Sequence, residues 1–274
     1  MSIALLTVLF GAIVGFSLGL TGGGGAIFAV PLLVFGLAFS PAEAVGISLV
    51  SVGTLSGIGL LGRWRIGHVE LKPGLIFAFA GMLGTPVGSW LSGQIPERLL
   101  LGLFAILMLV VALRMWFSAK SPETLQLSSH IEKDQGPVCR RDSAGILRLT
   151  SGCARLLALV GLAAGLLAGL FGVGGGFIIV PALIAFSGMT IHRAIGTSLL
   201  VVTLVSIVGV SSHLLLGRYI PVTTTLWFVL GGVLGMGLGI LASRRLSGPS
   251  LQRAFAIAIL AVALFVIIKS MVQL

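Results

Sequence analysis

Charged residues are scarce in this sequence of 274 residues, and their scarcity excludes most soluble folds. Asp, Glu, Lys and Arg together make up 9% of the chain, against about a quarter in an ordinary soluble domain. None of them occurs in residues 1–42, 156–192 or 219–243. Apolar runs longer than about 18 residues are typical of membrane-spanning helices. The sequence therefore predicts an all-α polytopic membrane protein.

Cysteine is also scarce. Cys139 and Cys153 are the only two, and they lie in or beside the most charged segment of the chain. We expect that segment to be cytoplasmic, so we predict no disulfide, and the absence of nearby ligand partners argues against a metal site. No cofactor is implied, because the glycine runs of the chain do not follow a strand as they do in a dinucleotide-binding unit.

The charges that are present are mostly positive, with 17 Lys and Arg against 7 Asp and Glu and a formal net charge of +10. In a soluble chain this excess would suggest a nucleic-acid partner. The sequence has no clusters of aromatic and basic residues of the kind that stack on bases. Cationic loops on the cytoplasmic side of a lipid bilayer account for the excess better, so we expect no nucleic-acid binding.

A glycine-rich stretch interrupts the first apolar run and recurs 150 residues later. The first copy, at 19–26, reads Gly-Leu-Thr-Gly-Gly-Gly-Gly-Ala, and the second, at 169–176, reads Gly-Leu-Phe-Gly-Val-Gly-Gly-Gly. Residues 15–33 and 165–183 share nine of nineteen identities, among them five glycines and a proline, and the match continues to Val52 and Val202. The chain is therefore predicted to have two homologous membrane repeats, 1–118 and 151–274, joined by a polar linker at 119–150.

Each glycine run must break an apolar stretch that is too long for one crossing. As a single helix, residues 3–39 would be roughly 54 Å long, against a hydrocarbon core of about 30 Å. Glycine is a poor helix former and takes positive φ freely, so it is suited to the break. We expect five helical segments in each half: 3–20, 26–38, 44–62, 73–92 and 99–118, then 152–170, 175–187, 194–215, 222–243 and 252–270.

The distribution of Lys and Arg predicts the orientation. If each glycine-broken pair returns to the side from which it started, 14 of the 17 Lys and Arg lie on one side, and 12 if each pair is one kinked crossing. The larger bias favours termini outside, a cytoplasmic linker and two halves inverted with respect to each other, as in many secondary transporters. The count does not separate two complete crossings from a re-entrant hairpin, although the second arms, roughly 20 Å long, are short for a full span.

These features resemble the sulfite exporter TauE/SafE family of membrane transporters. The resemblance rests on the paired Gly-Leu-x-Gly-x-Gly-Gly runs, each followed by Val-Pro, on the sequence Ala-Ile-Gly-Thr-Ser-Leu at 194–199, and on the glycine-rich stretches 81–88 and 231–239. It covers both halves and implies export of sulfite, organosulfonates or related small anions across a bacterial inner membrane. The first half has Ile47 where the second has Thr197, which leaves open whether the two halves contribute equally. The resemblance does not identify the substrate.

The two glycine turns are the predicted anion site. Consecutive glycines expose backbone N–H groups, and a helix N-terminus adds free N–H groups and a partial positive charge. Inverted halves would bring the two turns together. The alternative is that the glycines serve only close helix packing. The predicted substrate-binding residues are Thr21, Gly22, Gly23, Gly24, Gly25, Ser48, Ser51, Gly172, Gly174, Gly175, Gly176, Thr197 and Ser198.

Four ionisable residues near the apolar runs are candidates for gating or for an ion or proton relay: Glu43, His192, Arg193 and His213. Glu43 and Arg193 occupy equivalent positions of the repeat with opposite charge, and their alternative role is that of surface charges on short loops. His213 lies near the end of a span and has an unperturbed pKa near neutral, which suits a proton relay or anion contact. A hydrogen-bonded structural histidine is the other reading.

Two further classes of function stay open beside a secondary anion transporter. A membrane scaffold subunit would carry no substrate, and an intramembrane enzyme would need a paired nucleophile and base or a metal cluster at membrane depth. The sequence shows no such motif and no nucleotide-binding motif, so we expect no enzyme. The substrate, direction, coupling ion and oligomeric state do not follow from the sequence.

Overall fold

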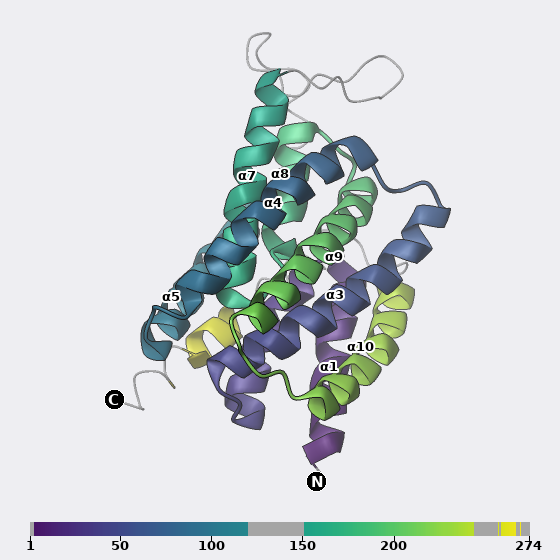
Figure 1. Cartoon of the computed structure of the whole chain (residues 1–274). Helices are drawn as coiled ribbons and strands as arrows, with labels where there is room; N and C mark the ends of the chain where they lie inside the picture. Colours follow the sequence, from purple (N-terminus) through teal and green to yellow (C-terminus); the bar gives the residue numbers. More distant parts are fainter. Residues whose placement is uncertain (1–2, 120–150, 244–256, 258, 267–268, 270–274) are drawn as a thin grey trace. The chain divides into compact units, whose positions relative to one another are not determined.

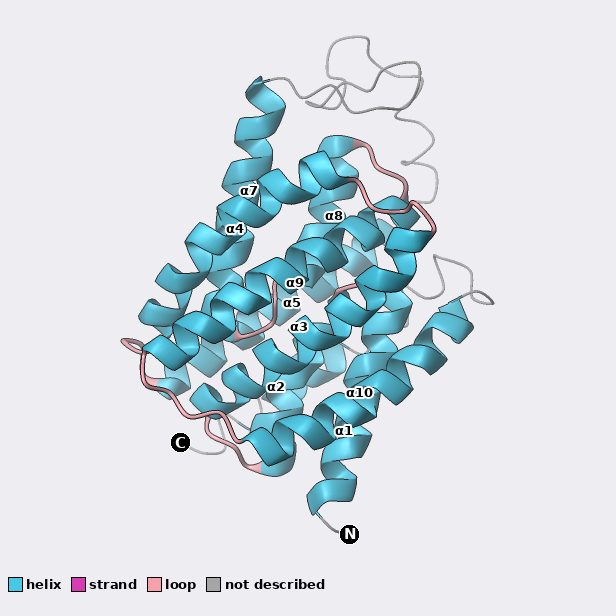
Figure 2. Ribbon diagram, turned by 45° about the vertical axis from the view of Figure 1, so that its right-hand side comes forward, coloured by secondary structure: helices cyan, strands magenta, loops and turns pink. Residues whose placement is uncertain are grey.

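The computed structural model describes residues 3–119, 151–243, 257, 259–266 and 269, and in these residues every regular element is helical (Figures 1 and 2). The chain forms two compact units. The larger combines Met1–Gln94 with Pro137–Ile240, and the smaller combines Ile95–Gly136 with Leu241–Leu274. Each unit therefore draws on both predicted halves. The predicted linker, apart from Ala119, lies outside the described residues.

The larger unit contains four segments from each half, in the same order. From the first half come α1 (Ile3–Thr21), a short helical arm made of η1 (Gly24–Phe28), α2 (Ala29–Pro31) and η2 (Leu32–Gly36), then α3 (Pro41–Arg65) and α4 (Leu71–Ser92). From the second half come α7 (Ser151–Phe171), α8 (Gly176–Ser187), α9 (Ile191–Leu215) and α10 (Val222–Ser243), the last of which ends at the unit boundary.

Helix lengths separate spans from short arms. Six described helices are long and apolar enough to cross a membrane, namely α1, α3, α4, α7, α9 and α10. The arm Gly24–Gly36 and α8 are shorter. The predicted all-α membrane fold, with a glycine turn and a short arm in each half, is thus confirmed. The smaller unit contains α5 (Glu97–Ala119). Of the predicted segment 252–270, the structure describes residues 257, 259–266 and 269, all of them helical.

Helix α3 begins three residues earlier than the hydropathy pattern predicts because its start is capped. The Ser40 hydroxyl accepts a hydrogen bond from the Glu43 backbone N–H at 3.3 Å, and the Glu43 carboxylate accepts one from the Ser40 N–H at 3.1 Å. Pro41 occupies the first helical position, where its missing N–H costs nothing. This capping box satisfies two backbone donors that apolar periodicity does not reveal.

Glycines on α1 let that helix lie directly against α10, as Figure 1 shows. A Cβ atom on Gly15 would overlap the backbone of Gly232, and one on Gly11 would overlap the carbonyl of Phe228. Gly19 faces Met236 in the same way. Residue numbers rise together on both helices, so the two run parallel. Small residues permit this close approach in a membrane, where van der Waals contact replaces hydrophobic driving force.

The same contact recurs between α7 and α4. Gly161 faces Phe77, Gly165 faces Gly81 and Gly169 faces Thr85, each so closely that a Cβ atom would overlap backbone. These three glycines lie 150 residues after Gly11, Gly15 and Gly19. The first helix of each half therefore packs against the α4 or α10 helix of the other half, and we call these two contacts the glycine seams.

Helices α3 and α9 pack on each other and occupy equivalent positions in the two halves (Figure 2). Along their contact, Gly46 meets His213, Gly53 meets Ser206 and Gly57 meets Thr203. Along this contact the residue numbers of α3 rise as those of α9 fall, so the two equivalent helices run antiparallel.

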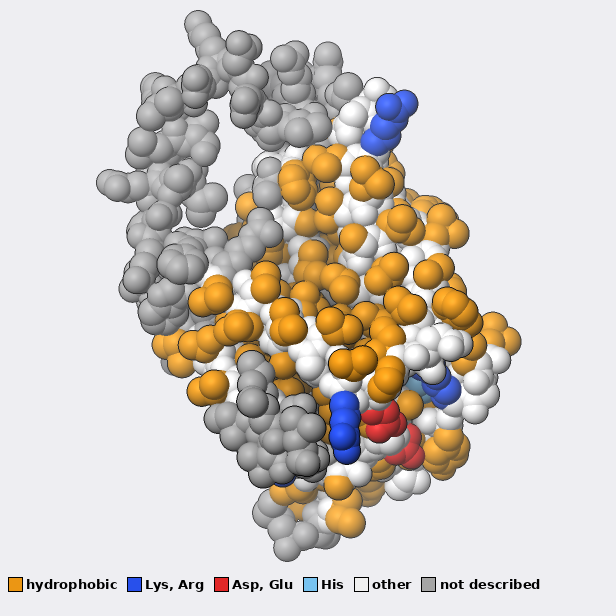
Figure 3. Space-filling model, turned by 90° about the vertical axis from the view of Figure 1, so that its left-hand side faces the viewer, with side chains coloured by type: hydrophobic (Ala, Val, Ile, Leu, Met, Phe, Trp, Pro, Cys, Tyr) orange, Lys and Arg blue, Asp and Glu red, His pale blue; other side chains and the backbone are white. Residues whose placement is uncertain are grey.

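The outward side chains of the described helices are largely apolar. Leu61, Leu83 and Leu215 are 68%, 72% and 89% exposed, and on the face drawn in Figure 3 hydrophobic side chains form most of the described surface. Surfaces of this kind are unfavourable in water and favourable against lipid chains. The protein is accordingly a multi-pass membrane protein.

The prediction of no disulfide is wrong. Cys153, in the first turn of α7, is buried and disulfide-bonded. The other cysteine of the chain lies outside the described residues. The prediction rested on the redox state of the expected compartment, and that argument says nothing about whether two thiols lie within bonding distance.

Candidate functional site

The two glycine turns meet in the larger unit. A Cβ atom on Gly23 would lie 3.0 Å from both the Cα and the carbonyl oxygen of Gly176, and one on Gly176 would lie 2.7 Å from the Cα of Gly23. Two segments separated by about half the chain thus approach backbone to backbone. Only glycine allows this approach, so the turns serve close packing whatever else they do.

Each turn also rests on the α3 or α9 helix of the opposite half. A Cβ atom on Gly22 would overlap Ile195 of α9, and one on Gly172 would overlap Val45 of α3. Both glycines have positive φ, +73° and +70°, a conformation that disfavours other residues. Gly22 is equivalent to Gly172, and Val45 to Ile195, so the two contacts are related by the repeat.

The second turn lies at mid-length of the α3–α9 pair. A Cβ atom on Gly174 would lie 3.1 Å from Val202, 3.2 Å from Val52 and 3.6 Å from the hydroxyl oxygen of Ser206. Val52 and Val202 are equivalent residues near the middle of their helices. Helix α8, which starts two residues after Gly174, therefore begins at about half the depth of the two long helices.

Four buried serine hydroxyls on α3 and α9 have no hydrogen-bond partner among the described residues: Ser48, Ser51, Ser56 and Ser206. Their side chains are at most 1% exposed. Eight other hydroxyls on the described helices donate to the backbone carbonyl four residues earlier, a common arrangement in helices. These are Thr7, Thr21, Thr54, Thr85, Ser187, Thr203, Ser211 and Thr225. Buried polar groups are rarely left unpaired, so the four exceptions need a functional or structural reason.

The predicted hydroxyl donors are distributed over different places. Ser48 and Ser51 belong to the unpaired set, and Ser198 donates to the carbonyl of Gly22 at 2.9 Å and to that of Ile195 at 2.8 Å. Ser198 thereby holds the first glycine turn against α9. Thr21 donates within α1, to Ser17.

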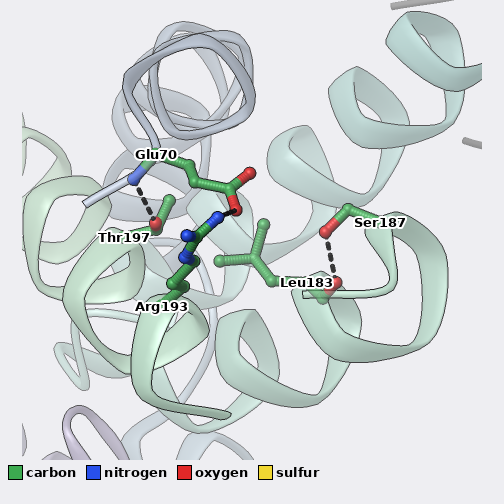
Figure 4. A network of polar contacts seen from close by, with 5 residues as sticks. All are labelled: Glu70, Leu183, Ser187, Arg193 and Thr197. Atoms are coloured by element: carbon green, nitrogen blue, oxygen red, sulfur yellow. Dashed lines mark hydrogen bonds and ion pairs between the residues drawn. The ribbon is translucent and has the colours of Figure 1, made fainter. Parts of the chain in front are cut away.

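Thr197 belongs to a polar cluster at the start of α9, shown in Figure 4. Its hydroxyl oxygen accepts a hydrogen bond from the Glu70 backbone N–H at 3.0 Å, and its methyl group faces Gly74 of α4. The Arg193 guanidinium forms an ion pair with the Glu70 carboxylate at 3.3 Å. The cluster ties the connection before α4 to α9, so the structure does not bring Thr197 to the glycine turns.

The other predicted gating residues also lie apart from one another. The carboxylate of Glu43 is used in the capping box of α3, while His192 is exposed, with its ring 6.1 Å from the ring of His68. His213 is fully buried against Gly46, and neither of its ring nitrogens has a partner among the described residues. Of these residues only His213 combines burial with an unpaired ionisable group.

The sequence analysis missed Arg218, which lies in the connection between α9 and α10. Its guanidinium donates to the Ser92 hydroxyl at 2.8 Å and to the Ser89 carbonyl at 3.0 Å, at the end of α4. Partial burial lowers the pKa of Arg218 from its ordinary value, but a guanidinium stays protonated in proteins. A cation is favourable at the carbonyl end of a helix.

The sequence analysis also missed Ser56 and Ser206. They are equivalent residues of the two halves, and each lies four residues beyond Val52 or Val202. Extending the repeat alignment by one helical turn would have found them. Within the described residues no group of three or more His, Cys, Asp or Glu is arranged to hold a metal ion.

Comparison with known proteins agrees with this architecture. Residues 7–266 match the family model described as "Sulfite exporter TauE/SafE". The chain is 36% identical to a "Probable membrane transporter protein" of Xylella fastidiosa, over 98% of this chain and 97% of that one. It is 29% identical to the "Probable membrane transporter protein YunE" of Bacillus subtilis, covering 87% and 89% of the two chains, and 28% identical to a protein of Haemophilus influenzae with the same general description, covering 97% and 98%. No solved structure matches the chain.

Proposed function

The chain belongs to the sulfite exporter TauE/SafE family of membrane transporters, and we propose that it is a secondary transporter that carries sulfite, an organosulfonate or a related small anion. The transport step is alternating access between two inverted halves, and the site of the anion is formed by the two glycine turns.

The meeting of Gly23 with Gly176 is the observation that carries this proposal. Helix α8 begins at Gly176, and the first helical arm begins at Gly24. A helix N-terminus has free backbone N–H groups and carries roughly half a positive charge. Two such ends, one from each half, provide the kind of site at which proteins bind anions.

The course of α3 and α9 supports inversion of the halves. They are equivalent helices, and they run antiparallel along a contact that includes Gly53 and Ser206. An inverted repeat requires this direction, whereas a parallel repeat would forbid it. Exchange of conformation between such halves opens a central site to one side and then to the other.

We propose that the short arms are re-entrant. Helix α8 has 12 residues, roughly 18 Å of helix, which is little more than half of a hydrocarbon core of about 30 Å. It starts where Gly174 faces the middle of α3 and α9. Irregular backbone at this depth is acceptable where it lines a site inside the protein.

The proposed location is the inner membrane, with the linker in the cytoplasm. The ion pair of Arg193 with Glu70 places the start of α9 and the start of α4 at one end of the larger unit. Arg65 and Lys72 lie beside that connection in sequence, so they belong to the side that carries 14 of the 17 basic residues. Basic residues accumulate on the cytoplasmic side. The inside-negative potential of such a membrane favours exit of anions.

His213 is the proposed proton-dependent element. Its imidazole is buried near one end of the α3–α9 pair and has no hydrogen-bond partner among the described residues, and histidine is the side chain that most readily takes up and releases a proton near neutral pH. Replacement by Gln keeps the size and polarity and removes the titration. If His213 takes part, flux through the His213→Gln variant loses the pH dependence that the unaltered chain shows. An unaltered pH profile would leave His213 with a structural role.

The experiment that tests the proposal measures thermal unfolding of the purified full chain with sulfite, sulfate, thiosulfate, taurine, sulfoacetate and simple carboxylates, followed by flux in proteoliposomes. We expect a saturable shift with at least one sulfur oxyanion, and its loss in Gly174→Val. Gly237→Val on α10 is the control, because a Cβ atom there meets nothing within 4 Å. A complete lack of anion response and of flux would contradict the proposal and favour a scaffold subunit.

A further inference from the structure

We propose that Ser56 and Ser206 are the side chains that bind the transported anion, and that the bound species carries a single negative charge. This inference rests on the proposed function and specifies its substrate class as a singly charged sulfur oxyanion, such as a sulfonate or hydrogen sulfite. Neither residue was part of the site predicted from the glycine turns.

Ser206 faces the second glycine turn and α3. Its hydroxyl oxygen is 3.6 Å from the position that a Cβ atom on Gly174 would take, and 3.4 Å from the corresponding position on Gly53. Gly174 thus lies against Val52, Val202 and Ser206 at mid-length of the α3–α9 pair, and the Ser206 hydroxyl is the polar group of this contact. The Ser206 hydroxyl could therefore donate a hydrogen bond to an anion bound between the second glycine turn, α3 and α9.

Ser56 is the equivalent group on the other half. It follows Val52 by one helical turn and therefore lies on the side of α3 that Val52 presents to Gly174. Ser56 and Ser206 are 0% and 1% exposed, and neither hydroxyl has a hydrogen-bond partner among the described residues. Because equivalent residues of an inverted repeat are related by an approximate two-fold axis, the pair offers one hydroxyl from each half to a ligand near that axis.

Other hydroxyls on the same two helices do have partners, whereas Ser48 and Ser51, like Ser56 and Ser206, have none among the described residues. On α9, Thr203 and Ser211 donate to the carbonyls of Leu199 and Ile207, and on α3, Thr54 donates to Val50. A serine in a helix can donate to such a carbonyl. The hydroxyls of Ser56 and Ser206 make no such bond, and a buried hydroxyl without a partner is unfavourable unless a ligand completes it.

The charge of the surroundings indicates the charge of the ligand. Among the described residues, the buried polar side chains are serines, threonines and His213, with no buried Lys or Arg. The positive charge near the turns then comes from two helix N-termini, each worth roughly half an elementary charge. Together they balance about one negative charge. A dianion such as sulfate would keep about one charge uncompensated in a poorly solvated site, which is strongly unfavourable.

The test uses the purified full chain with two probes of fixed charge, methanesulfonate and sulfate. Dissociation constants are measured from ligand-dependent thermal unfolding, and flux of each probe is measured in proteoliposomes. We expect methanesulfonate to stabilise and to cross, and sulfate to do neither. Ser56→Ala and Ser206→Ala should each weaken methanesulfonate binding by about tenfold or more, the effect of one hydrogen bond to a charged group.

Matched controls come from the same two helices. Thr54→Val and Ser211→Ala remove exposed hydroxyls that bond only within their own helix, and we expect them to change binding by less than about twofold. If an alanine variant loses its folded state, Ser→Cys at the same position replaces the hydroxyl with a weak donor of similar size.

The outcomes separate this inference from the proposed function. Equal binding of sulfate and methanesulfonate would overturn the single-charge assignment, and unchanged binding in the Ser56→Ala, Ser206→Ala double variant would overturn the hydroxyl pair. In both cases persistent anion flux would leave the proposed function standing. A lack of any anion binding or flux in the unaltered chain would overturn both.

Discussion

Ser48 and Ser198 occupy equivalent positions in the two halves, yet the surroundings of their hydroxyls differ. Ser198 donates to the carbonyl of Gly22 at 2.9 Å and so fixes the first glycine turn. The hydroxyl of Ser48 has no partner among the described residues, although Val45, one turn earlier on α3, contacts Gly172 of the second turn. The contact of each glycine turn with α9 or α3 is repeated in both halves, and the hydrogen bond is not.

The difference extends to other equivalent pairs. The glycine seams are matched almost residue for residue. Polar positions differ, because in the repeat alignment Arg63 is equivalent to His213, Ser51 to Val201 and Ile47 to Thr197. Backbone proximity therefore defines the shared framework, and polar side chains distinguish the two halves. Under the proposed alternating access, hydrogen bonds made in only one half are the ones that an exchange of conformations would break and form.

The largest losses of stability should come from substitutions in the two glycine seams, which are alike in both halves. Gly15→Ala and Gly165→Ala place a Cβ atom against the backbone of Gly232 and Gly81, respectively. We expect each to destabilise the protein by about 1–3 kcal/mol or more, as overpacked sites do, and by similar amounts. Thermal unfolding of the purified variants measures this, with Gly237→Ala as the control on α10. Clearly unequal losses would show that the two seams are not equivalent in energy.

Much of the fold could be predicted because hydropathy and glycine placement act locally. The run lengths gave α1, α4, α7 and α10 to within a few residues, and the glycine runs marked both turns. The pairing of helices was not predictable in the same way. An apolar face with glycines, such as the one through Gly11, Gly15 and Gly19, fits any similar face, so the sequence does not say that its partner is α10 rather than α4.

The sequence predicted that the two glycine turns meet, but not which hydroxyls lie beside them. The sequence indicated the turns, and the structure brings Gly23 and Gly176 together. It also suggested Thr197 as a donor at the turns, but the Thr197 hydroxyl oxygen accepts a hydrogen bond from the Glu70 backbone N–H, in the polar cluster at the start of α9. Hydrogen-bond partners depend on which helices become neighbours, which composition and spacing do not specify. The repeat alignment ended at Val52 and Val202, and extending it by four residues would have shown that Ser56 and Ser206 are equivalent.

An intermediate effect should sharpen the comparison of Ser198 with Ser48. Ser198→Ala removes the hydrogen bond to the Gly22 carbonyl, and we expect a loss of about 1 kcal/mol of stability. Ser48→Ala removes a buried hydroxyl that has no partner among the described residues, so its effect on stability should be near zero or slightly favourable. Both are measured by thermal unfolding in the absence of anions. Equal losses would mean that Ser48 has a partner of equal importance.

A somewhat smaller contrast is expected at the helix starts. Ser40 caps α3 with its side chain, whereas the equivalent Thr190 before α9 makes no side-chain capping bond. Ser40→Ala should therefore cost about 0.5–1 kcal/mol and Thr190→Ala almost nothing. Hydrogen exchange of the first turns of α3 and α9 would locate the effect. Increased exchange at α9 in Thr190→Ala would contradict this reading.

The smallest effect should come from the ion pair of Arg193 with Glu70. Arg193 is nearly half exposed, with 46% of its side chain accessible, and exposed ion pairs contribute roughly 0–1 kcal/mol. We expect Arg193→Gln to shift unfolding only slightly and to do so less at high salt, where charges are screened. A large, salt-independent shift would show that the cluster with Thr197 contributes through its hydrogen bonds instead.

The glycine seams have a consequence for biosynthesis. During translation α1 enters the membrane long before α10 has been synthesised, and α4 enters before α7. The glycine faces of α1 and α4 are therefore exposed to lipid until their partner helices are inserted. Neither half can reach its final packing until the ribosome has delivered the other. A chain divided within residues 120–150 should therefore yield two fragments that are degraded when each is expressed alone. When both are expressed together, they should associate and be stable.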